Sequence, residues 1–356
     1  MSAPIMAALL SCQTTSLTDA EKFLFARANP LGVTLFARNI ANKSQLKHLI
    51  REIKEAVGRE DVLIAVDQEG GRVRRLKEPD FRPYSAQAEI GSLPLEQAVQ
   101  AARLQAELIS ADLRDLGINV NFAPVLDICM PQTTEALRSR CFSDTQKTVS
   151  LLGKTMTETY IESGILPCIK HMPGHGPAVS DTHLGLPVID ISDSELENQL
   201  MPFRACNNSP LGMTAHILLP QIDKENPITQ SPAGIKKLIR EKIDFQGLLI
   251  SDAIDMMALN GAVTDKAVKS LNAGCDAVCY CMGNEDEMSA LSAVCPKLSD
   301  VAQERLDKAV QILHNQPQIG SLEKKAAKYK ALTGCIAAYQ ETYDATEVLH
   351  QLSKRT

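Results

Sequence analysis

Residues 62–71 read Val62-Leu63-Ile64-Ala65-Val66-Asp67-Gln68-Glu69-Gly70-Gly71. Five apolar residues in an unbroken row are typical of a strand that is buried on both faces of a parallel sheet. Charged residues and glycines follow at once, which marks the change from strand to loop. The segment therefore predicts a buried parallel strand that ends at Val66, with polar side chains in the loop that follows it.

Seven more apolar runs repeat this pattern along the chain. Segments with helical periodicity separate them, and several open with a side chain that can accept the free N–H groups of a helix start. Gly117, Gly164 and Gly274 follow three of these segments, where glycine readily takes the left-handed conformation of a helix end. The seven runs are Ile5–Leu10, Gly32–Phe36, Asn119–Phe122, Ile165–Ile169, Leu211–Thr214, Leu248–Ile250 and Ala277–Tyr280. The expected helices open at 16–19 and 42–44, cover Glu96–Leu116 and Gln146–Ser163, and begin again near Asp193, Ser231 and Thr264.

The eightfold alternation of strand and helix predicts an α/β fold, a closed (β/α)8 barrel of the TIM type. The competing fold is an open doubly wound sheet, which would carry a glycine-rich phosphate loop after its first strand. Ser11-Cys12-Gln13-Thr14-Thr15 is not such a loop. We expect a catalytic barrel over residues 1–320. A helical extension, packed on the barrel, is expected over residues 321–356, with helices at Leu322–Lys330 and Ile336–Leu352.

The composition excludes several classes of partner. The 356-residue chain has a formal net charge of −6 with dispersed Lys and Arg, which argues against nucleic acid. No apolar stretch approaches the ~18 residues that a membrane span requires. Several of the ten cysteines, such as Cys168 and Cys279, lie in or beside apolar runs, as free buried thiols do. We therefore expect a cytoplasmic protein, monomeric or weakly self-associating, that binds neither nucleic acid nor membrane.

Polar residues gather directly after the predicted strands. Four of the seven histidines, His171, His175, His183 and His216, belong to this set. Enzymes with a (β/α)8 barrel place their working residues on the loops at these strand ends. This edge of the barrel is therefore the predicted active site. Its polar segments are 67–75, 121–127 with 138–140, 170–176 with 180–183, 214–216 and 251–252.

Two kinds of catalytic site fit these residues poorly. A metal site built from His171, His175, His183 and carboxylates would place the first two on one helical face, but a Pro-Gly pair at 173–174 lies between them. A serine nucleophile would require a Gly-x-Ser-x-Gly elbow, and no glycine surrounds Ser251. We therefore expect neither a metal ion nor a catalytic serine.

Two-step glycosyl transfer fits the residues better. It requires a carboxylate nucleophile below the anomeric carbon and an acid/base group above the glycosidic oxygen, about 5–5.5 Å apart. Asp252, at a strand end on the barrel rim, can supply the nucleophile. Asp181 and His183 are two positions apart, so in an extended loop the carboxylate can orient an imidazole that transfers the proton. On spacing alone, an ordinary loop turn at 181–183 fits as well.

At these residues the sequence resembles glycoside hydrolase family 3, specifically its single-domain bacterial β-N-acetylhexosaminidases of peptidoglycan recycling. The segments Lys170–Gly176 and Asp181–Pro187 look like the signature of that group, including its Asp-x-His loop. The likeness covers about residues 5–315. It extends through Leu35–Asn39, Asp67–Arg75, Asn121–Asp127, Met213–His216, Phe245–Gly247 and Ser251-Asp252.

The resemblance implies a role for each matching position. It makes Asp252 the nucleophile, His183 the acid/base and Asp181 its supporting carboxylate. The implied substrates are N-acetylglucosaminyl-1,6-anhydro-N-acetylmuramyl peptides from cell-wall turnover, and no cofactor is implied. The positions that match sugar-binding residues are Asp67, Arg75, Arg140, Lys170 and His171.

Some residues depart from the family pattern. Ala253 follows the nucleophile position, where the family has a second acidic residue, and Cys141 and Thr145 stand in the Arg140 loop, where other residue types are usual. The alternatives to this activity are another family 3 specificity, such as β-glucosidase, and a catalytically silent sugar-binding barrel. The Asp-x-His loop argues against the β-glucosidase, and the presence of all three catalytic positions argues against the silent barrel.

Overall fold

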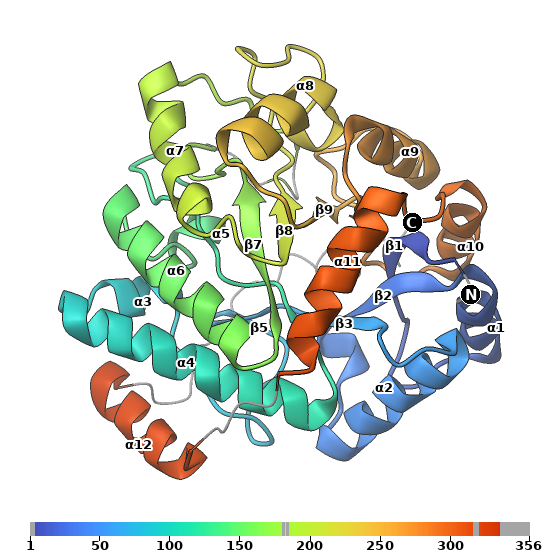
Figure 1. Ribbon diagram of the computed structural model, residues 1–356, viewed down its shortest axis with the longest axis horizontal. Coiled ribbons are helices and arrows are strands. Elements are labelled where there is room, and N and C mark those ends of the chain that lie inside the picture. The colour runs from blue at the N-terminus through green and yellow to red at the C-terminus, as the bar shows by residue number, and fades with distance from the viewer. Residues whose placement is uncertain (1–3, 180–181, 183–184, 316–319, 335–356) are drawn as a thin grey trace.

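The computed structural model describes residues 4–179, 182, 185–315 and 320–334. At its centre is a closed barrel of eight strands, surrounded by helices (Figure 1). Neighbouring barrel strands are parallel, and they follow one another around the barrel in chain order. The predicted (β/α)8 barrel is therefore confirmed. Its strands are β1 (Met6–Ser11), β2 (Pro30–Leu35), β3 (Leu63–Val66), β6 (Val120–Asn121), β7 (Leu166–Met172), β8 (Leu211–Thr214), β9 (Leu248–Ala253) and β10 (Ala277–Cys279).

The eight predicted apolar runs are the eight barrel strands, although most of their ends differ. Two strands continue three residues beyond their predicted ends: β9 from Ile250 to Ala253, and β7 from Ile169 to Met172. Lys170 and His171 therefore belong to the strand and not to the loop after it. A short antiparallel hairpin, β4 (Gln68–Gly70) with β5 (Val73–Arg74), occupies the loop after β3.

The helices begin and end largely at the predicted signals. Thr18 and Asn42 each accept a backbone N–H at the start of a helix, and Gly117 and Gly274 end two helices with φ values of 87° and 116°. Within the described part of the chain, every helix is too short or too polar to traverse a lipid bilayer. The α-helices are α1 (Asp19–Ala28), α2 (Lys43–Val57), α3 (Gln87–Gly91), α4 (Leu95–Leu116), α5 (Glu135–Arg138), α6 (Gln146–Glu162), α7 (Asp193–Ala205), α8 (Pro232–Gly234), α9 (Val263–Ala273), α10 (Glu285–Val294), α11 (Asp300–Leu313) and α12 (Leu322–Thr333), and a π-helix over Ile235–Lys242 continues α8.

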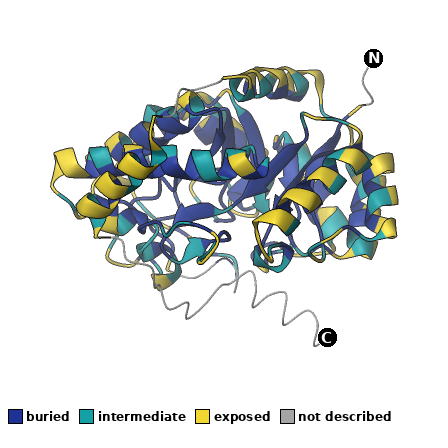
Figure 2. Ribbon diagram, turned by 90° about the horizontal axis from the view of Figure 1, so that it is seen from below, coloured by how far each residue is buried: buried dark blue, intermediate teal, exposed yellow. Residues whose placement is uncertain are grey.

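Most of the barrel strands contribute to two apolar cores. In β3, Leu63 and Ala65 face the interior of the barrel, whereas Ile64 and Val66 pack against the surrounding helices. Both faces are buried, which is why the strand reads as an unbroken apolar run. Figure 2 shows the result as buried strands at the centre and helices whose outer faces are exposed.

Helix α11 closes one end of the barrel. Just before this helix, the Leu298 N–H donates to the Ile5 carbonyl beside the start of β1. Ala302, Leu306 and Ala309 of α11 then join the interior core. Figure 1 shows α11 lying across the barrel. The covered end is the one at which the strands begin. Access to the barrel is therefore from the other end, where the strands finish.

Helix α12 packs on α4. The Tyr329 hydroxyl donates to Gln105 of α4 and accepts the Ser85 N–H at 2.8 Å. The expected first helix of the C-terminal extension is thus present, three residues longer than predicted. The second, Ile336–Leu352, lies outside the described residues, and the division near residue 320 stays a prediction.

Candidate active site

Strand alternation places three polar side chains at the open end of the barrel. Leu248 and Ile250 of β9 face the interior core, so the next residue on that face is Asp252. The interior rows of β3 and β7 lead in the same way to Asp67 and Lys170. All three side chains therefore converge above the apolar interior, although they are far apart in the sequence.

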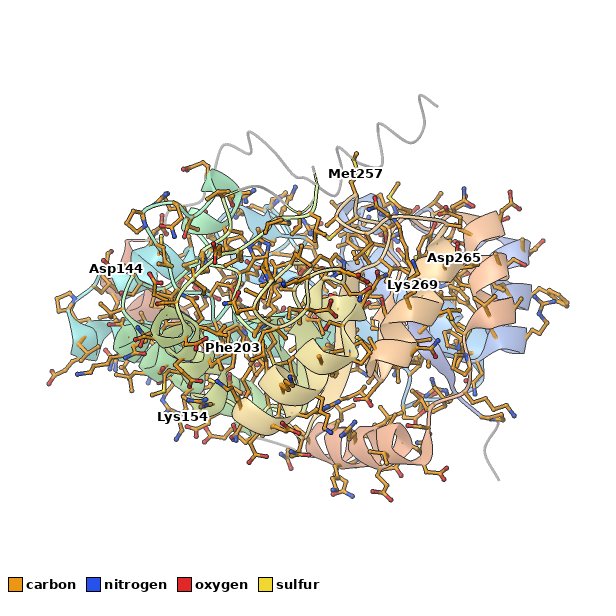
Figure 3. All side chains as sticks on the ribbon, turned by 90° about the horizontal axis from the view of Figure 1, so that it is seen from above. Asp144, Lys154, Phe203, Met257, Asp265 and Lys269 are labelled. Carbon is orange, nitrogen blue, oxygen red and sulfur yellow. The ribbon has the colours of Figure 1, made fainter. Side chains whose placement is uncertain are left out.

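A cleft occupies this end of the barrel, with about 1070 Å³ of empty space when open solvent is included. In Figure 3 the open end of the barrel is at the top, where Met257 of the loop after β9 points outwards. Helix α11 covers the opposite end, at the bottom of the picture. Six of the eight predicted site residues line the cleft, so the structure brings them together. They are Asp67, Arg75, Arg140, Lys170, His171 and Asp252.

The other two predicted residues, Asp181 and His183, lie outside the described residues. Thr182, between them in the sequence, is described: it is buried, lines the cleft and accepts the Ala258 N–H through its carbonyl at 3.2 Å. The expected contact between Asp181 and His183 is therefore not tested.

A network of ion pairs crosses the cleft wall. The Lys170 ammonium lies 2.7 Å from a carboxylate oxygen of Asp67 and 2.7 Å from one of Glu69. Arg140 donates two hydrogen bonds to Glu69, at 2.8 and 2.9 Å, and Arg75 donates to Asp67 at 3.2 Å. The network therefore links β3, β7, the β4–β5 hairpin and the loop after β6.

Opposite charges keep these groups ionised in spite of their burial. Burial by itself would raise the pKa of Asp67, but Lys170 and Arg75 outweigh it and hold that pKa below its usual value. Burial would also raise the pKa of Glu69, but Arg140 and Lys170 outweigh it and hold that pKa well below its usual value. The pKa of Lys170 is raised because the two carboxylates outweigh its own burial. The cleft therefore holds fixed charges of both signs at neutral pH.

Asp127 positions the His171 ring. Its carboxylate lies 2.7 Å from His171 Nδ1 and accepts the His175 backbone N–H at 2.7 Å. His171 Nε2 lies 3.4 Å from an Arg140 nitrogen, so the ring is held between a carboxylate and a guanidinium. Burial opposes ionisation of Asp127, but the two histidines hold its pKa below the usual value.

His175 lines the cleft as a neutral ring. Burial lowers the pKa of His175 to about 4. Its ring lies 5.9 Å from that of His171, and among the described residues its Nδ1 has no hydrogen-bond partner. His175 therefore forms part of the buried wall of the cleft, packed against the His171 ring.

Asp252 is partly exposed to the cleft, and its Oδ1 accepts the N–H of Ala253 at 2.8 Å. The strand end that carries it is fixed by His216, whose Nε2 contacts the Ala253 carbonyl at 3.0 Å and whose Nδ1 contacts the Thr229 hydroxyl at 2.8 Å. His216, expected among the rim groups, is fully buried. It supports β9 and does not line the cleft.

Sequence reasoning gave no role to three acidic residues of the site, although Glu69 and Asp127 lie in polar segments that it placed at the strand ends. Glu69 and Asp127 hold the predicted sugar-binding side chains, as described above, and Asp255 lines the cleft. Asp255 accepts the Cys281 N–H at 2.8 Å, and burial raises its pKa to about 6. The spacing of Asp67 and Glu69 at i and i+2 could have suggested that both point to one face. In the described segments, no three His, Cys, Asp or Glu side chains are grouped in a way that could hold a metal ion.

The profile of the glycosyl hydrolase family 3 N-terminal domain matches residues 9–315, which include every predicted site residue. The chain belongs to glycoside hydrolase family 3. It is therefore a glycoside hydrolase, and the family resemblance inferred from its motifs is confirmed.

Similar proteins of this family are hexosaminidases by name, and similar solved structures share the fold. A β-hexosaminidase of Idiomarina loihiensis is 33% identical over 302 residues, which cover 83% of this chain and 89% of the relative. The structure of NagZ from Neisseria gonorrhoeae in complex with N-trifluoroacetyl-D-glucosamine has a TM-score of 0.81 and 30% identity, covering 93% of this chain and 98% of NagZ. A β-N-acetylglucosaminidase from Paenibacillus sp. str. FPU-7 has a TM-score of 0.74 and 25% identity, covering 98% of this chain and 67% of that enzyme.

The charge of Glu69 is expected to stabilise this family 3 hydrolase. Glu69→Gln leaves Arg140 without its carboxylate and should lower the free energy of unfolding by about 3–5 kcal/mol near neutral pH. The depressed pKa of Glu69 means that its contribution is present above the unfolded pKa of about 4.3 and is lost as the pH falls below it. Urea unfolding at about pH 7 and about pH 3.5 should therefore show a smaller difference between variant and wild type at the lower pH.

Glu60→Gln is the matched control, because the Glu60 side chain is 92% exposed. It should change the free energy of unfolding by less than about 0.5 kcal/mol. Equal losses in the two variants, or a Glu69 effect that does not shrink in acid, would contradict the prediction.

Proposed function

We propose that this glycoside hydrolase is a retaining β-N-acetylhexosaminidase that removes terminal β-linked N-acetylglucosamine from muropeptides. The observation that carries the proposal is the position of Asp252 in the cleft. It is a partly exposed carboxylate at the end of an interior strand row, in the same cleft as Asp67, Lys170 and His171. The names of the similar β-hexosaminidases and the aminosugar bound to the similar NagZ support the same substrate class.

In the proposed mechanism, Asp252 attacks the anomeric carbon and forms a covalent glycosyl-enzyme. The leaving-group oxygen takes a proton from His183, which Asp181 orients. The same imidazole then removes a proton from the water that hydrolyses the intermediate, so the configuration at the anomeric carbon is retained. The support for His183 is its position in the Asp-x-His loop, whose Thr182 lines the cleft.

The ion-pair network would recognise the sugar in the −1 subsite. A carboxylate such as Asp67 can accept protons from two neighbouring hydroxyls, and Lys170 and Arg75 can donate to hydroxyl or acyl oxygens. Asp67 already bonds to both Lys170 and Arg75, so the three side chains are held in position before substrate arrives. A preorganised site of this kind binds without the entropic cost of ordering long side chains.

We also propose that the enzyme works in the cytoplasm on cell-wall fragments, as a monomer or weak oligomer. The nine cysteines in the described part of the chain are free thiols, and seven of them are buried. Free thiols in such numbers are typical of proteins in reducing compartments.

The first test is substrate preference. The enzyme should release 4-nitrophenol from its β-N-acetylglucosaminide with a kcat/KM on the order of 10²-fold or more above that for the β-glucoside, because a site that bonds the acetamido group rejects an analogue that lacks it. The two rates are measured side by side by absorbance. A preference for the β-glucoside would refute the proposed specificity and leave the family assignment intact.

The second test concerns the nucleophile. Asp252→Ala should lower kcat by on the order of 10⁴-fold or more with the fold intact, because no substitute nucleophile is available for the covalent step. In the wild type, a 5-fluoro glycoside should trap the intermediate, and peptide mapping should find the label on Asp252. Asp265→Ala, at an exposed position of α9 (Figure 3), is the control and should keep full activity. Normal turnover by folded Asp252→Ala, or a label elsewhere, would exclude the proposed role.

The third test separates two candidate proton donors, His183 and Asp255. His183→Ala should lower the rate by about 10²–10⁴-fold on substrates with poor leaving groups, and much less on 4-nitrophenyl glycosides, which need little acid assistance. Asp255→Asn should affect both kinds of substrate equally, because its carboxyl already accepts the Cys281 N–H. If the dependence on the leaving group appeared in the Asp255 variant instead, the proton donor would be Asp255.

A further inference from the structure

The segment Cys129–Ser143, which contains α5, forms one wall of the cleft. It is closed at its base by a hydrogen bond from the Cys129 N–H to the Ser143 carbonyl at 2.9 Å. It carries Arg140, which reaches across to Glu69, as well as Thr134 and Leu137, which line the cleft. The position of this wall therefore decides where Arg140 stands relative to a bound substrate.

Two cysteines meet at the base of this wall. Cys129 is half-buried, and Cys141, directly after Arg140, is buried. Cys129 packs against a small apolar cluster formed by Cys141, Val125 and Leu137, and the Cys141 thiol donates to the Leu137 carbonyl at 3.4 Å.

A guanidinium lies beside this thiol pair. Arg138 Nη1 is 3.7 Å from Cys129 Sγ, while its Nη2 donates to the carbonyls of Pro131 and Thr133 at 3.1 and 2.8 Å. These two bonds hold the positive charge next to the sulfur. A partly exposed sulfur next to a fixed cation and a second thiol is the usual environment of a reactive cysteine.

The acidity of Cys129 agrees with this geometry. The neighbouring Cys141 thiol is the main cause that lowers the pKa of Cys129 to about 6, with Arg138 and Thr133 acting in the same direction and burial and Asp144 against it. Cys129 is therefore mostly thiolate at neutral pH. By contrast, burial raises the pKa of Cys295, which is also half-buried, to about 12.

We propose that Cys129 is a modification site for small disulfides and other thiol-reactive electrophiles, with Cys141 as its resolving thiol. The chemistry takes two steps. The Cys129 thiolate attacks a disulfide RSSR, forms the mixed disulfide Cys129-S-S-R and expels RS⁻. Cys141 then attacks the Cys129 sulfur, loses its proton and expels the second RS⁻. In total, the protein dithiol is oxidised to one disulfide, and RSSR is reduced to two RSH.

Oxidation of the pair acts on the cleft through Arg140. A disulfide holds its sulfurs about 2.05 Å apart, much closer than two thiols in contact. The wall must move to bring the two sulfurs together. Arg140 moves with it, because it is the residue directly before Cys141. Its carbonyl also accepts a hydrogen bond from Gln87 at 2.9 Å, so a shift there disturbs a second anchor of the wall. Oxidation therefore lowers activity without touching the nucleophile.

The first experiment maps the reactive thiol. The folded enzyme is treated with substoichiometric iodoacetamide, and peptide mass spectrometry locates the label. Cys129 should be alkylated on the order of 100-fold or more faster than Cys295 near neutral pH, because the thiolate is the reacting form. Its rate should fall about 10-fold between about pH 7 and about pH 5, as expected for a pKa about 6. Labelling of Cys295 at an equal rate would overturn the proposal.

The second experiment follows the disulfide. Incubation with oxidised glutathione should link Cys129 to Cys141 and lower kcat/KM by on the order of 10- to 100-fold, with recovery on addition of dithiothreitol. Cys129→Ser should be insensitive, Cys141→Ser should stop at the glutathione adduct, and Cys295→Ser should behave as wild type. Full activity of the disulfide form, or inactivation that persists in Cys129→Ser, would refute the coupling.

These outcomes are independent of the proposed sugar specificity. The peptide maps require no substrate, and the activity can be followed with any β-glycoside that the hydrolase cleaves. A failure of the thiol proposal therefore leaves the proposed function standing, and the reverse also holds.

Discussion

The active-site end of the barrel depends on the charge of Lys170. Its ammonium is buried among side chains, where an unpaired charge would cost several kcal/mol. Two carboxylates at 2.7 Å compensate for this cost, one from Asp67 at the end of β3 and one from Glu69 in the following hairpin. Glu69 in turn binds Arg140. One buried cation thus fixes the relative positions of three separate chain segments around the cleft.

The same network connects the two proposals. Lys170, Asp67 and Arg75 offer fixed hydrogen-bonding groups to a sugar above the apolar floor of the barrel, beside the proposed nucleophile Asp252. Arg140 belongs both to this network and to the wall that holds the Cys129–Cys141 pair. A chemical change at that pair would therefore shift the Cys129–Ser143 segment and, with it, the Arg140 side chain that bonds to Glu69 in the cleft.

Much of the fold was predictable because strand periodicity is local. An unbroken apolar run indicates a strand that is buried on both faces of a sheet. Eight such runs in alternation with helices indicate an α/β fold with a parallel sheet. The same alternation brings Asp252 to the interior row of β9. The extension of β7 through Lys170 and His171 was not predictable, because these residues are polar and their strand pairing depends on partners in other segments. His216 was placed at the rim for its polarity, but its hydrogen bonds to Thr229 and Ala253 bury it.

The sequence by itself determined the order of the strands along the chain, their burial on both faces and the family to which the chain belongs, since these depend on apolar runs and motifs whose residues lie close together in the chain. Only the tertiary structure decided which charges neutralise one another. In the sequence, Lys170 is 103 residues from Asp67 and Arg140 is 71 residues from Glu69. His171 is 44 residues from Asp127. It also made one cysteine acidic, because the Cys141 thiol and the Arg138 guanidinium both lie against Cys129. Electrostatic interactions depend on distance through space, and closure of the barrel sets those distances.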